Sequence, residues 1–244
     1  MKKLIPALLL LAIAAYSCKT SEPEPEPEVV TAPAITMPSI KGVDGIFVAI
    51  KMSTKSGGTE SFTGTGQAVF YKSAGSTIKV EAGGGKLAGK TLIKSDDNIY
   101  FYAPTTAEPK GIVFGTQILW EMSANAANGV PQISDNDGGG FPNTPVLPES
   151  IILDQTQVKN ISWVSSVGSD STILLVKGPN ATFKQVLPPS VTFFDLAKSD
   201  IAKLGVGAGE ITIINYKVTQ KTFGGKSYAF VKQSTAFTNK VAIK

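Results

Sequence analysis

Residues 210–218 read EITIINYKV, and this stretch shows the pattern that dominates the chain. Ile214, Tyr216 and Val218 alternate with the more polar Asn215 and Lys217. A period of two residues is typical of a β-strand, because successive side chains point to opposite faces. Similar short runs, rich in β-branched and aromatic residues and bounded by Gly, Ser, Asp or Pro, occupy residues 46–52, 67–72, 77–81, 91–94, 99–103, 112–120, 158–164, 172–177, 181–187, 191–194, 227–233 and 236–243. The sequence therefore predicts an all-β fold.

One segment departs from this pattern. Residues 195–204 place Leu196, Ile201 and Leu204 toward one side, and Gly205 follows as a C-cap, so the spacing predicts a short helix. A short helix that crosses between strands is common in immunoglobulin-like sandwiches. We therefore expect two β-sandwich modules of this type, at 42–145 and 146–244, and the alternative is one larger sandwich or jelly roll.

The composition excludes several classes of function. The chain has 244 residues, 42% of them hydrophobic and 17% charged, which is enough apolar material for a packed core. Its 23 basic residues are all lysine, and it has no histidine. The absence of histidine removes the commonest general acid–base and metal ligand, and the absence of arginine removes the bidentate reader of guanine and phosphate. We therefore expect no triad hydrolase, no histidine metal site and no nucleic-acid partner.

The N-terminus has the order of a secretory signal. Lys2 and Lys3 precede an apolar run over residues 4–15, and Ser17 and Cys18 follow it. The run is shorter than the roughly 20 helical residues that a bilayer requires, and a basic start before such a run is typical of a signal peptide. Cys18 is the only cysteine, so it forms no disulfide within the chain.

The pair Ser17-Cys18 resembles the lipobox of bacterial lipoproteins, as found in Bacteroidota, although Ala15 stands where that family usually has leucine. The resemblance implies that residues 1–17 are cleaved as a signal peptide and that Cys18 carries acyl chains such as palmitate. It further implies a lipid-anchored protein of the bacterial cell envelope, at the outer membrane, with the lipid bilayer as its partner. The alternative is an ordinary secreted protein. The resemblance ends near residue 20 and says nothing about the fold.

A stalk is expected after the lipidated cysteine. Residues 22–28 alternate glutamate and proline, which favours an extended polyproline II conformation. Pro33 and Pro38 continue the stretch without an amphipathic period. We therefore assign residues 18–41 to the lipidated N-terminus and its flexible stalk, and we expect the folded part to begin near Gly42.

Residues 123–148 are rich in Gly, Asn, Asp and Pro, and we expect a linker between the modules or a binding loop. Within it, Asp135, Asn136 and Asp137 precede three glycines and resemble the start of a calcium loop. The fifth and twelfth positions of such a loop hold Gly139 and Val146, which supply no side-chain oxygen. A solvated turn is the alternative. We expect no other cofactor or metal.

Three functions remain open. The first is a non-enzymatic module that binds an envelope protein or a glycan through loops such as 123–148. The second is a structural or assembly subunit of a cell-surface complex that acts through strand edges. The third is a carboxylate-only glycoside hydrolase, for which Glu121, Glu149 and Asp154 are the first candidates. The pattern assigns no catalytic residue, and Trp120 and Trp163 lie in apolar runs that favour core packing over a sugar-stacking platform.

Overall fold

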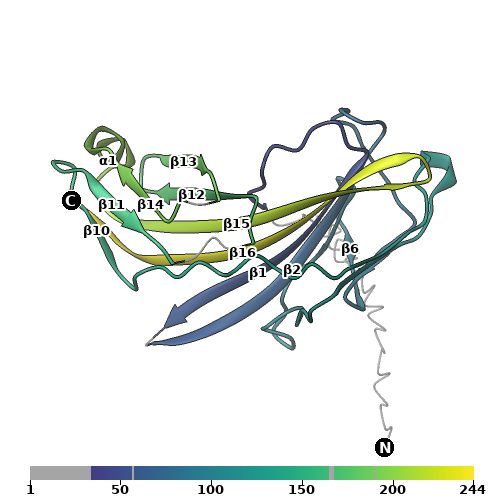
Figure 1. Ribbon diagram of the computed structural model, residues 1–244, viewed down its shortest axis with the longest axis horizontal. Helices are drawn as coiled ribbons and strands as arrows, with labels where there is room; N and C mark the ends of the chain where they lie inside the picture. The colour runs from purple at the N-terminus through teal and green to yellow at the C-terminus, as the bar shows by residue number, and fades with distance from the viewer. Residues whose placement is uncertain (1–33, 57, 165–167, 190) are drawn as a thin grey trace, which may run out of the picture.

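A computed structural model describes residues 34–56, 58–164, 168–189 and 191–244 (Figure 1). The signal peptide at 1–17, Cys18 and most of the expected stalk lie outside these residues. Over the described residues the fold is built from strands, with one α-helix and one short 3-10 helix. The expected all-β fold is confirmed.

A 10-stranded sheet forms the centre of the molecule. Its main path runs in the order β13 (Thr182–Leu187), β12 (Ser171–Lys177), β15 (Gly207–Phe223), β16 (Lys226–Ile243), β1 (Gly45–Ser56), β2 (Thr59–Tyr71), β7 (Ile99–Tyr102) and β6 (Ile93–Lys94). Two short strands join it from the side: β3 (Lys79–Val80) pairs with β2, and β10 (Ile151–Leu153) pairs with β16. Neighbours on the main path are antiparallel except β1 and β16, which are parallel.

This sheet joins the two halves of the chain. The parallel pairing of β1 with β16 runs from Gly45 opposite Tyr228 to Ser53 opposite Ala236. The expected modules at 42–145 and 146–244 therefore share one sheet rather than forming two, which corrects the expectation of separate sheets. The alternation in each run predicts a strand, but it does not determine which strand lies beside it.

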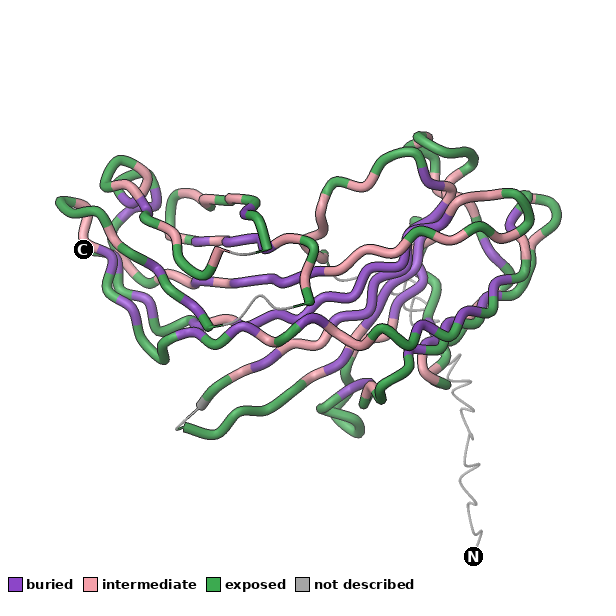
Figure 2. Tube along the Cα trace, in the orientation of Figure 1, coloured by how far each residue is buried: buried purple, intermediate pink, exposed green. Residues whose placement is uncertain are grey.

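Two layers cover different ends of one face of this sheet. The first is a 4-stranded sheet in the order β5 (Lys90–Thr91), β4 (Gly85–Leu87), β8 (Ile118–Met122) and β9 (Ile133–Asp137). The second consists of the two-stranded sheet of β11 (Lys159–Ser162) and β14 (Phe193–Leu196), together with α1 (Lys198–Leu204). Figure 2 shows burial concentrated along the central strands beneath these layers.

Each layer closes a hydrophobic cluster. Under the 4-stranded sheet, Phe47 stacks on Phe230 with ring centroids 4.6 Å apart, and Trp120 meets Phe47 edge-on. Under α1, Ile201 and Leu204 are buried, so the helix predicted within 195–204 is confirmed in its last two turns. The first part of that range is strand β14 instead, because it pairs with β11.

Polar side chains separate the two clusters on this face, and residues 138–147 cross above them. Ser234 donates a hydrogen bond to the carbonyl of Pro142 at 2.6 Å, and Asn215 donates one to the carbonyl of Asn143 at 2.9 Å. The range 123–148 also contains the 3-10 helix η1 (Ala126–Asn128) and strand β9. It is therefore not the structureless linker or loop that its composition predicts.

The opposite face of the sheet carries a third cluster, which includes Ile46, Val48 and Val231. Ile35, Met37 and Ile40 pack against this cluster. Gln233 donates a hydrogen bond to the carbonyl of Thr36 at 2.8 Å. The folded part therefore begins before Gly42, because three apolar side chains in the last part of the expected stalk find an apolar sheet face to cover.

Candidate functional site

The central sheet forks beside β16. On one side of β16, β1 pairs as far as Ala236, and β10 begins its pairing at Val241. Residues 237–240 therefore have no strand partner on that side among the described residues. Beyond Ser53, β1 stays paired with β2 and diverges from β16, as Figure 1 shows at the tip of the hairpin.

A β-bulge lies opposite this fork. Between β15 and β16, Gly209 pairs with Val241 and Ile211 with Thr238, so β16 holds the extra residue. A bulge bends the strand that carries it and increases its twist. A Cβ on Gly209 would lie 2.8 Å from the carbonyl oxygen of Lys177, so the close approach of β12 requires glycine there. The bend turns β16 away from β1 and opens the fork.

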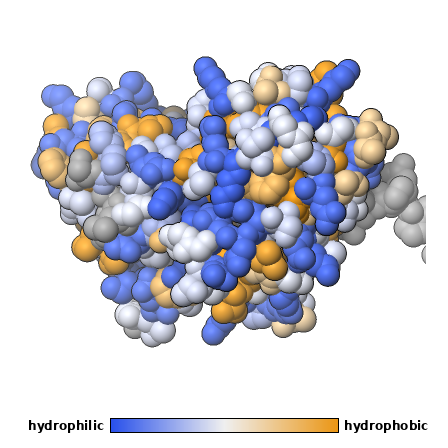
Figure 3. Space-filling model, turned by 45° about the vertical axis from the view of Figure 1, so that its right-hand side comes forward, coloured by the Kyte–Doolittle hydropathy of each residue, from blue (hydrophilic) through white to orange (hydrophobic). Residues whose placement is uncertain are grey.

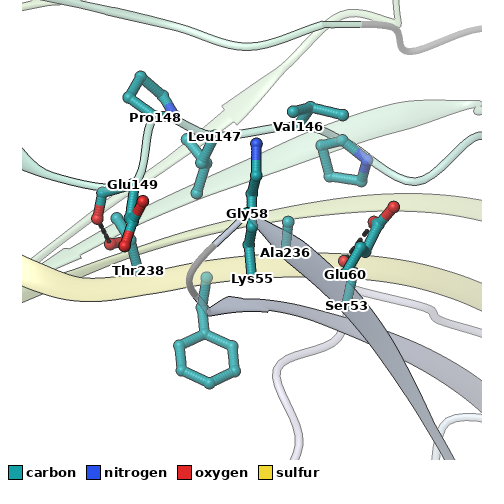
Figure 4. A pocket seen from close by; sticks show the side chains of 12 residues that line it. Ser53, Lys55, Gly58, Glu60, Val146, Leu147, Pro148, Glu149, Ala236 and Thr238 are labelled. Carbon is teal, nitrogen blue, oxygen red and sulfur yellow. Dashed lines mark hydrogen bonds between the residues drawn. The ribbon is translucent and has the colours of Figure 1, made fainter.

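A groove of about 180 Å³ occupies the fork (Figure 4). One wall comes from the β1–β2 hairpin, with Ser53, Lys55 and Glu60, and the opposite wall comes from residues 145–149. Residues 236–238 of β16 form the floor. The hairpin tip around the groove is exposed in Figure 2, so the groove opens to solvent.

The charges of the groove are only partly paired. Ser53 donates a hydrogen bond to Glu60 at 2.5 Å, and the Glu149 carboxylate pairs with Lys240. The hydrogen bond and charge of Lys240, with a smaller contribution from Lys55, hold the pKa of Glu149 below its ordinary value. Lys55 has no ion-pair partner among the described residues. The groove lining therefore carries two carboxylates, Glu60 and Glu149, and one lysine, Lys55, which lies opposite Glu60 in the hairpin register.

The suggested calcium residues are placed differently from the sequence prediction. Asp135, Asn136 and Asp137 lie in strand β9, so the segment is not a turn. Asp135 accepts hydrogen bonds from Lys221 at 2.7 and 2.9 Å. The Asn136 side chain points the other way, as strand geometry requires, and donates a hydrogen bond to Gln117. The three side chains do not converge on one point, and the described residues contain no group of three acidic or other metal-binding side chains.

Asp137 forms a buried ion pair with Lys232. Its Oδ2 lies 3.0 Å from Nζ, and the two side chains are only 12% and 3% exposed. Burial by itself raises the pKa of Asp137, but Lys232, the N–H of Gly139 and the charge of Lys221 together bring it below its ordinary value. Both aspartates of β9 are therefore held by lysines of the central sheet, and their chemistry is that of a structural link between layers.

The three candidate carboxylates of a glycosidase lie at different places. Glu121 is on β8, opposite Ser134 of β9, whereas Asp154 follows β10 and accepts hydrogen bonds from the N–H and hydroxyl of Thr156. Only Glu149 lines the groove. Glu60, which no motif in the sequence singles out, shares the groove with Glu149. Glycosidases use a general acid whose pKa is raised, whereas the hydrogen bond and charge of Lys240 lower the pKa of Glu149.

Both tryptophans pack in the core. Trp120 is 2% exposed in the first cluster and Trp163 is 4% exposed in the second, which confirms that core packing accounts for them. Neither presents an open ring face for a sugar. The Nε1 of Trp163 is buried without a hydrogen-bond partner among the described residues.

Comparison of the chain with protein-family models, with curated proteins and with solved structures finds no match. Within the described part of the chain, the one α-helix is too short to cross a membrane. Figure 3 shows a mainly hydrophilic face on which apolar side chains are scattered in small groups.

Proposed function

We propose that this protein is a lipid-anchored lipoprotein of a bacterial cell envelope that binds a protein or a glycan without catalysis. The anchor is Cys18, acylated after removal of residues 1–17, and the binding site is the groove between β1 and β16. The proposal draws on the basic and apolar N-terminus with its single cysteine. The single structural observation that supports binding is the solvent-open groove at a fork in the sheet, lined by Lys55, Glu60 and Glu149.

The placement of the tether is compatible with this function. Ile35, Met37 and Ile40 pack on the face of the sheet that carries Ile46 and Val231. The groove opens on the other face, because residues 145–149, which form one of its walls, lie over that face, where Thr238 donates a hydrogen bond to the carbonyl of Glu149. The described residues closest to the anchor therefore leave the groove uncovered.

The anchor is tested with Cys18→Ala. Acylation of Cys18 holds the protein in membranes, so we expect the variant to remain unprocessed or to leave the membrane fraction. Fractionation and intact mass measurement of the purified protein report both effects. If the variant is processed and sediments with lipid as the wild type does, the anchor assignment is wrong.

Binding is tested on glycan and peptide arrays with the mature chain. The double variant Lys55→Glu with Val146→Glu places negative charge on both walls of the groove, where Lys55 is exposed and Val146 is 44% exposed. The matched control Lys184→Glu with Val186→Glu makes the same changes at exposed positions of β13, the edge strand at one end of the sheet. We expect array signals that the groove variant loses and the control keeps. Signals that both variants keep would exclude the groove.

A further inference from the structure

We infer that the face of the central sheet opposite the groove binds the acyl chain of a membrane lipid, in two cavities beneath residues 34–40, the N-terminal strap. Ile35, Met37 and Ile40 of the strap pack on the third cluster of this face. The site is separate from the groove, and its ligand differs from the one proposed there. A membrane lipid is the source, because in the proposed function the acyl chains of Cys18 lie in the bilayer as the anchor.

The two cavities lie between the strap and the sheet. The first has a volume of about 270 Å³ and extends over β1, β2 and β7. The second has a volume of about 350 Å³ and extends over β1, β16, β15 and β12. Ala34 and Ile35 of the strap line both cavities, so each is bounded by the sheet on one side and by the strap on the other. They are therefore pockets within the fold and not an open surface.

The cavities follow β1 in sequence. Ile46 and Val48 line the first cavity, and the next residues on the same face, Ile50 and Met52, line the second. From Ile46 to Met52 the strand rises about 20 Å, at roughly 3.3 Å per residue. One acyl chain spans half of the roughly 30 Å hydrocarbon core of a bilayer, which is about 15 Å. The path along β1 therefore accommodates a single acyl chain.

The floor of the cavities favours an acyl chain over a peptide or a sugar. Along this path β1 is paired on both sides, with β2 and with β16, so its backbone groups are used within the sheet. A buried peptide would leave its own N–H and C=O groups without partners there, and a sugar its hydroxyls, at a cost in free energy. The strap meets this need at Thr36, whose carbonyl accepts a hydrogen bond from Gln233 at 2.8 Å. An acyl chain carries no such groups along its length.

The charged groups of the lining are already engaged. In the first cavity Lys79 pairs with Asp97 at 2.5 Å, and in the second Glu210 accepts a hydrogen bond from the hydroxyl of Thr212 at 3.1 Å. An apolar pocket with few polar groups is typical of sites that bind apolar small molecules.

Tyr71 marks the polar end of the site. It lines the first cavity, and its N–H bonds to the carbonyl of Asp44, two residues before Ile46. Its hydroxyl has no hydrogen-bond partner in the described part of the chain. Burial raises the pKa of Tyr71 although the charge of Lys79 opposes the rise, so the phenol is a neutral donor at neutral pH. The lipid ester carbonyl would accept from Tyr71, with the tail running along β1 toward Met52.

The test uses the mature chain with Cys18→Ala, which carries no acyl chains and requires no detergent. Octanoyl, lauroyl and palmitoyl monoglycerides compete with a fluorescent fatty acid for the protein. We expect the affinity to rise by up to about fourfold for each added CH₂, because each one buries further apolar surface. Tyr71→Phe should weaken all three by about fivefold, through loss of one hydrogen bond. Equal affinities across the series, or no binding, would overturn the inference.

The direction of the chain is tested with Met52→Trp, which fills the second cavity from a half-buried position. We expect at least about a tenfold loss for the palmitoyl monoglyceride and little change for the octanoyl one, whose tail ends in the first cavity. The matched control is Ile93→Trp on β6, at a position that is 54% exposed and lines neither cavity. A loss that the control shares, or one that is equal for both ligands, would overturn the assigned path.

The remaining occupants give different results. The acylated wild type, in vesicles of phosphatidylethanolamine with a photoreactive acyl chain, should be labelled in the lining of the cavities; binding by the Cys18→Ala chain without such labelling would assign the cavities to the chains of Cys18 and overturn the membrane-lipid source. Binding that appears only after Val29→Ser with Val30→Ser would make these residues the occupant and would also overturn the inference. The groove variant Lys55→Glu with Val146→Glu should bind the monoglycerides as the wild type does, so failure at one site is distinguishable from failure at the other.

Discussion

Replacing Lys232 by Met leaves the Asp137 carboxylate buried without its cation. The two side chains are 3% and 12% exposed, with Nζ and Oδ2 3.0 Å apart, so neither is solvated well enough to tolerate loss of the other. Removal of one partner of a buried ion pair typically costs about 3–5 kcal/mol of stability, because an uncompensated charge remains. Met keeps most of the apolar volume of the lysine stem, so the loss reports mainly on the charge. We expect the free energy of unfolding at neutral pH to fall by about that amount.

The pH dependence of this loss separates charge from packing. In the wild type the pKa of Asp137 lies below its ordinary value of 3.8, so the pair stabilises the fold above that value and the contribution disappears as the pH falls through the lowered pKa. In Lys232→Met the burial effect dominates and the pKa of Asp137 rises. The Asp137 carboxylate of the variant is therefore protonated, and its destabilising buried charge removed, at a higher pH than in the wild type. The difference between variant and wild type should therefore shrink steadily as the pH falls toward 3.

Urea unfolding monitored by tryptophan fluorescence, at neutral pH and at several acidic pH values, measures this difference. The double variant Lys232→Met with Asp137→Leu removes both charges and should recover most of the lost stability. Lys240→Met, which breaks the exposed pair with Glu149, serves as the control and should change little. A loss in Lys232→Met that is independent of pH and not recovered in the double variant would refute the role of the ion pair.

Three further outcomes follow from the structure. Gly139→Ala should lower stability by about 1–3 kcal/mol in the same urea assay, because its Cβ would lie 2.9 Å from the buried Nζ of Lys232. Gly138→Ala, whose Cβ would have nothing within 4 Å, should leave stability unchanged, and equal effects of the two variants would contradict this. Burial raises the pKa of Tyr228 to about 12, so the folded state holds the phenol proton more tightly than the unfolded state. The free energy of unfolding should therefore fall as the pH rises from about 10 toward 12. Tyr228→Phe should reduce that fall, and absorbance titration should show one late-titrating tyrosine. Ile35→Ser with Met37→Ser should lower the melting temperature by several degrees, because both side chains pack on the third cluster, and an unchanged melting temperature would place them outside the folded part.

The period-two pattern of the sequence determined the strands themselves. In β15 the residues that alternate in EITIINYKV do face opposite sides of the central sheet, with Ile213 in the second cluster and Ile214 in the third. The short helix before this strand also follows from local spacing, because Ile201 and Leu204 need one buried side. Local patterns suffice where the information lies within a few residues, and the N-terminal signal is of the same kind.

The neighbours of each strand were decided only by the tertiary structure. Gly45 pairs with Tyr228 across most of the chain, and no local pattern encodes such a partner. For the same reason Asp135 and Asp137 resembled a solvated turn or a calcium loop: their partners, Lys221 and Lys232, are far away in sequence. A strand with inward carboxylates is stable only when a second layer brings cations to it.

The groove depends on the same long-range information. It exists because β1 ends its pairing at Ser53, β10 begins its own at Ile151, and the bulge between them bends β16. The longer strands can be predicted from their alternation, whereas the short strands β9 and β10 were not. The gap between two strands on a third depends on register, which packing of the whole sheet determines. The sequence by itself thus determined most of the longer strands, the helix and the expected anchor, whereas the short strands β9 and β10, the shared sheet, the buried ion pairs and the site at the fork were decided by the tertiary structure.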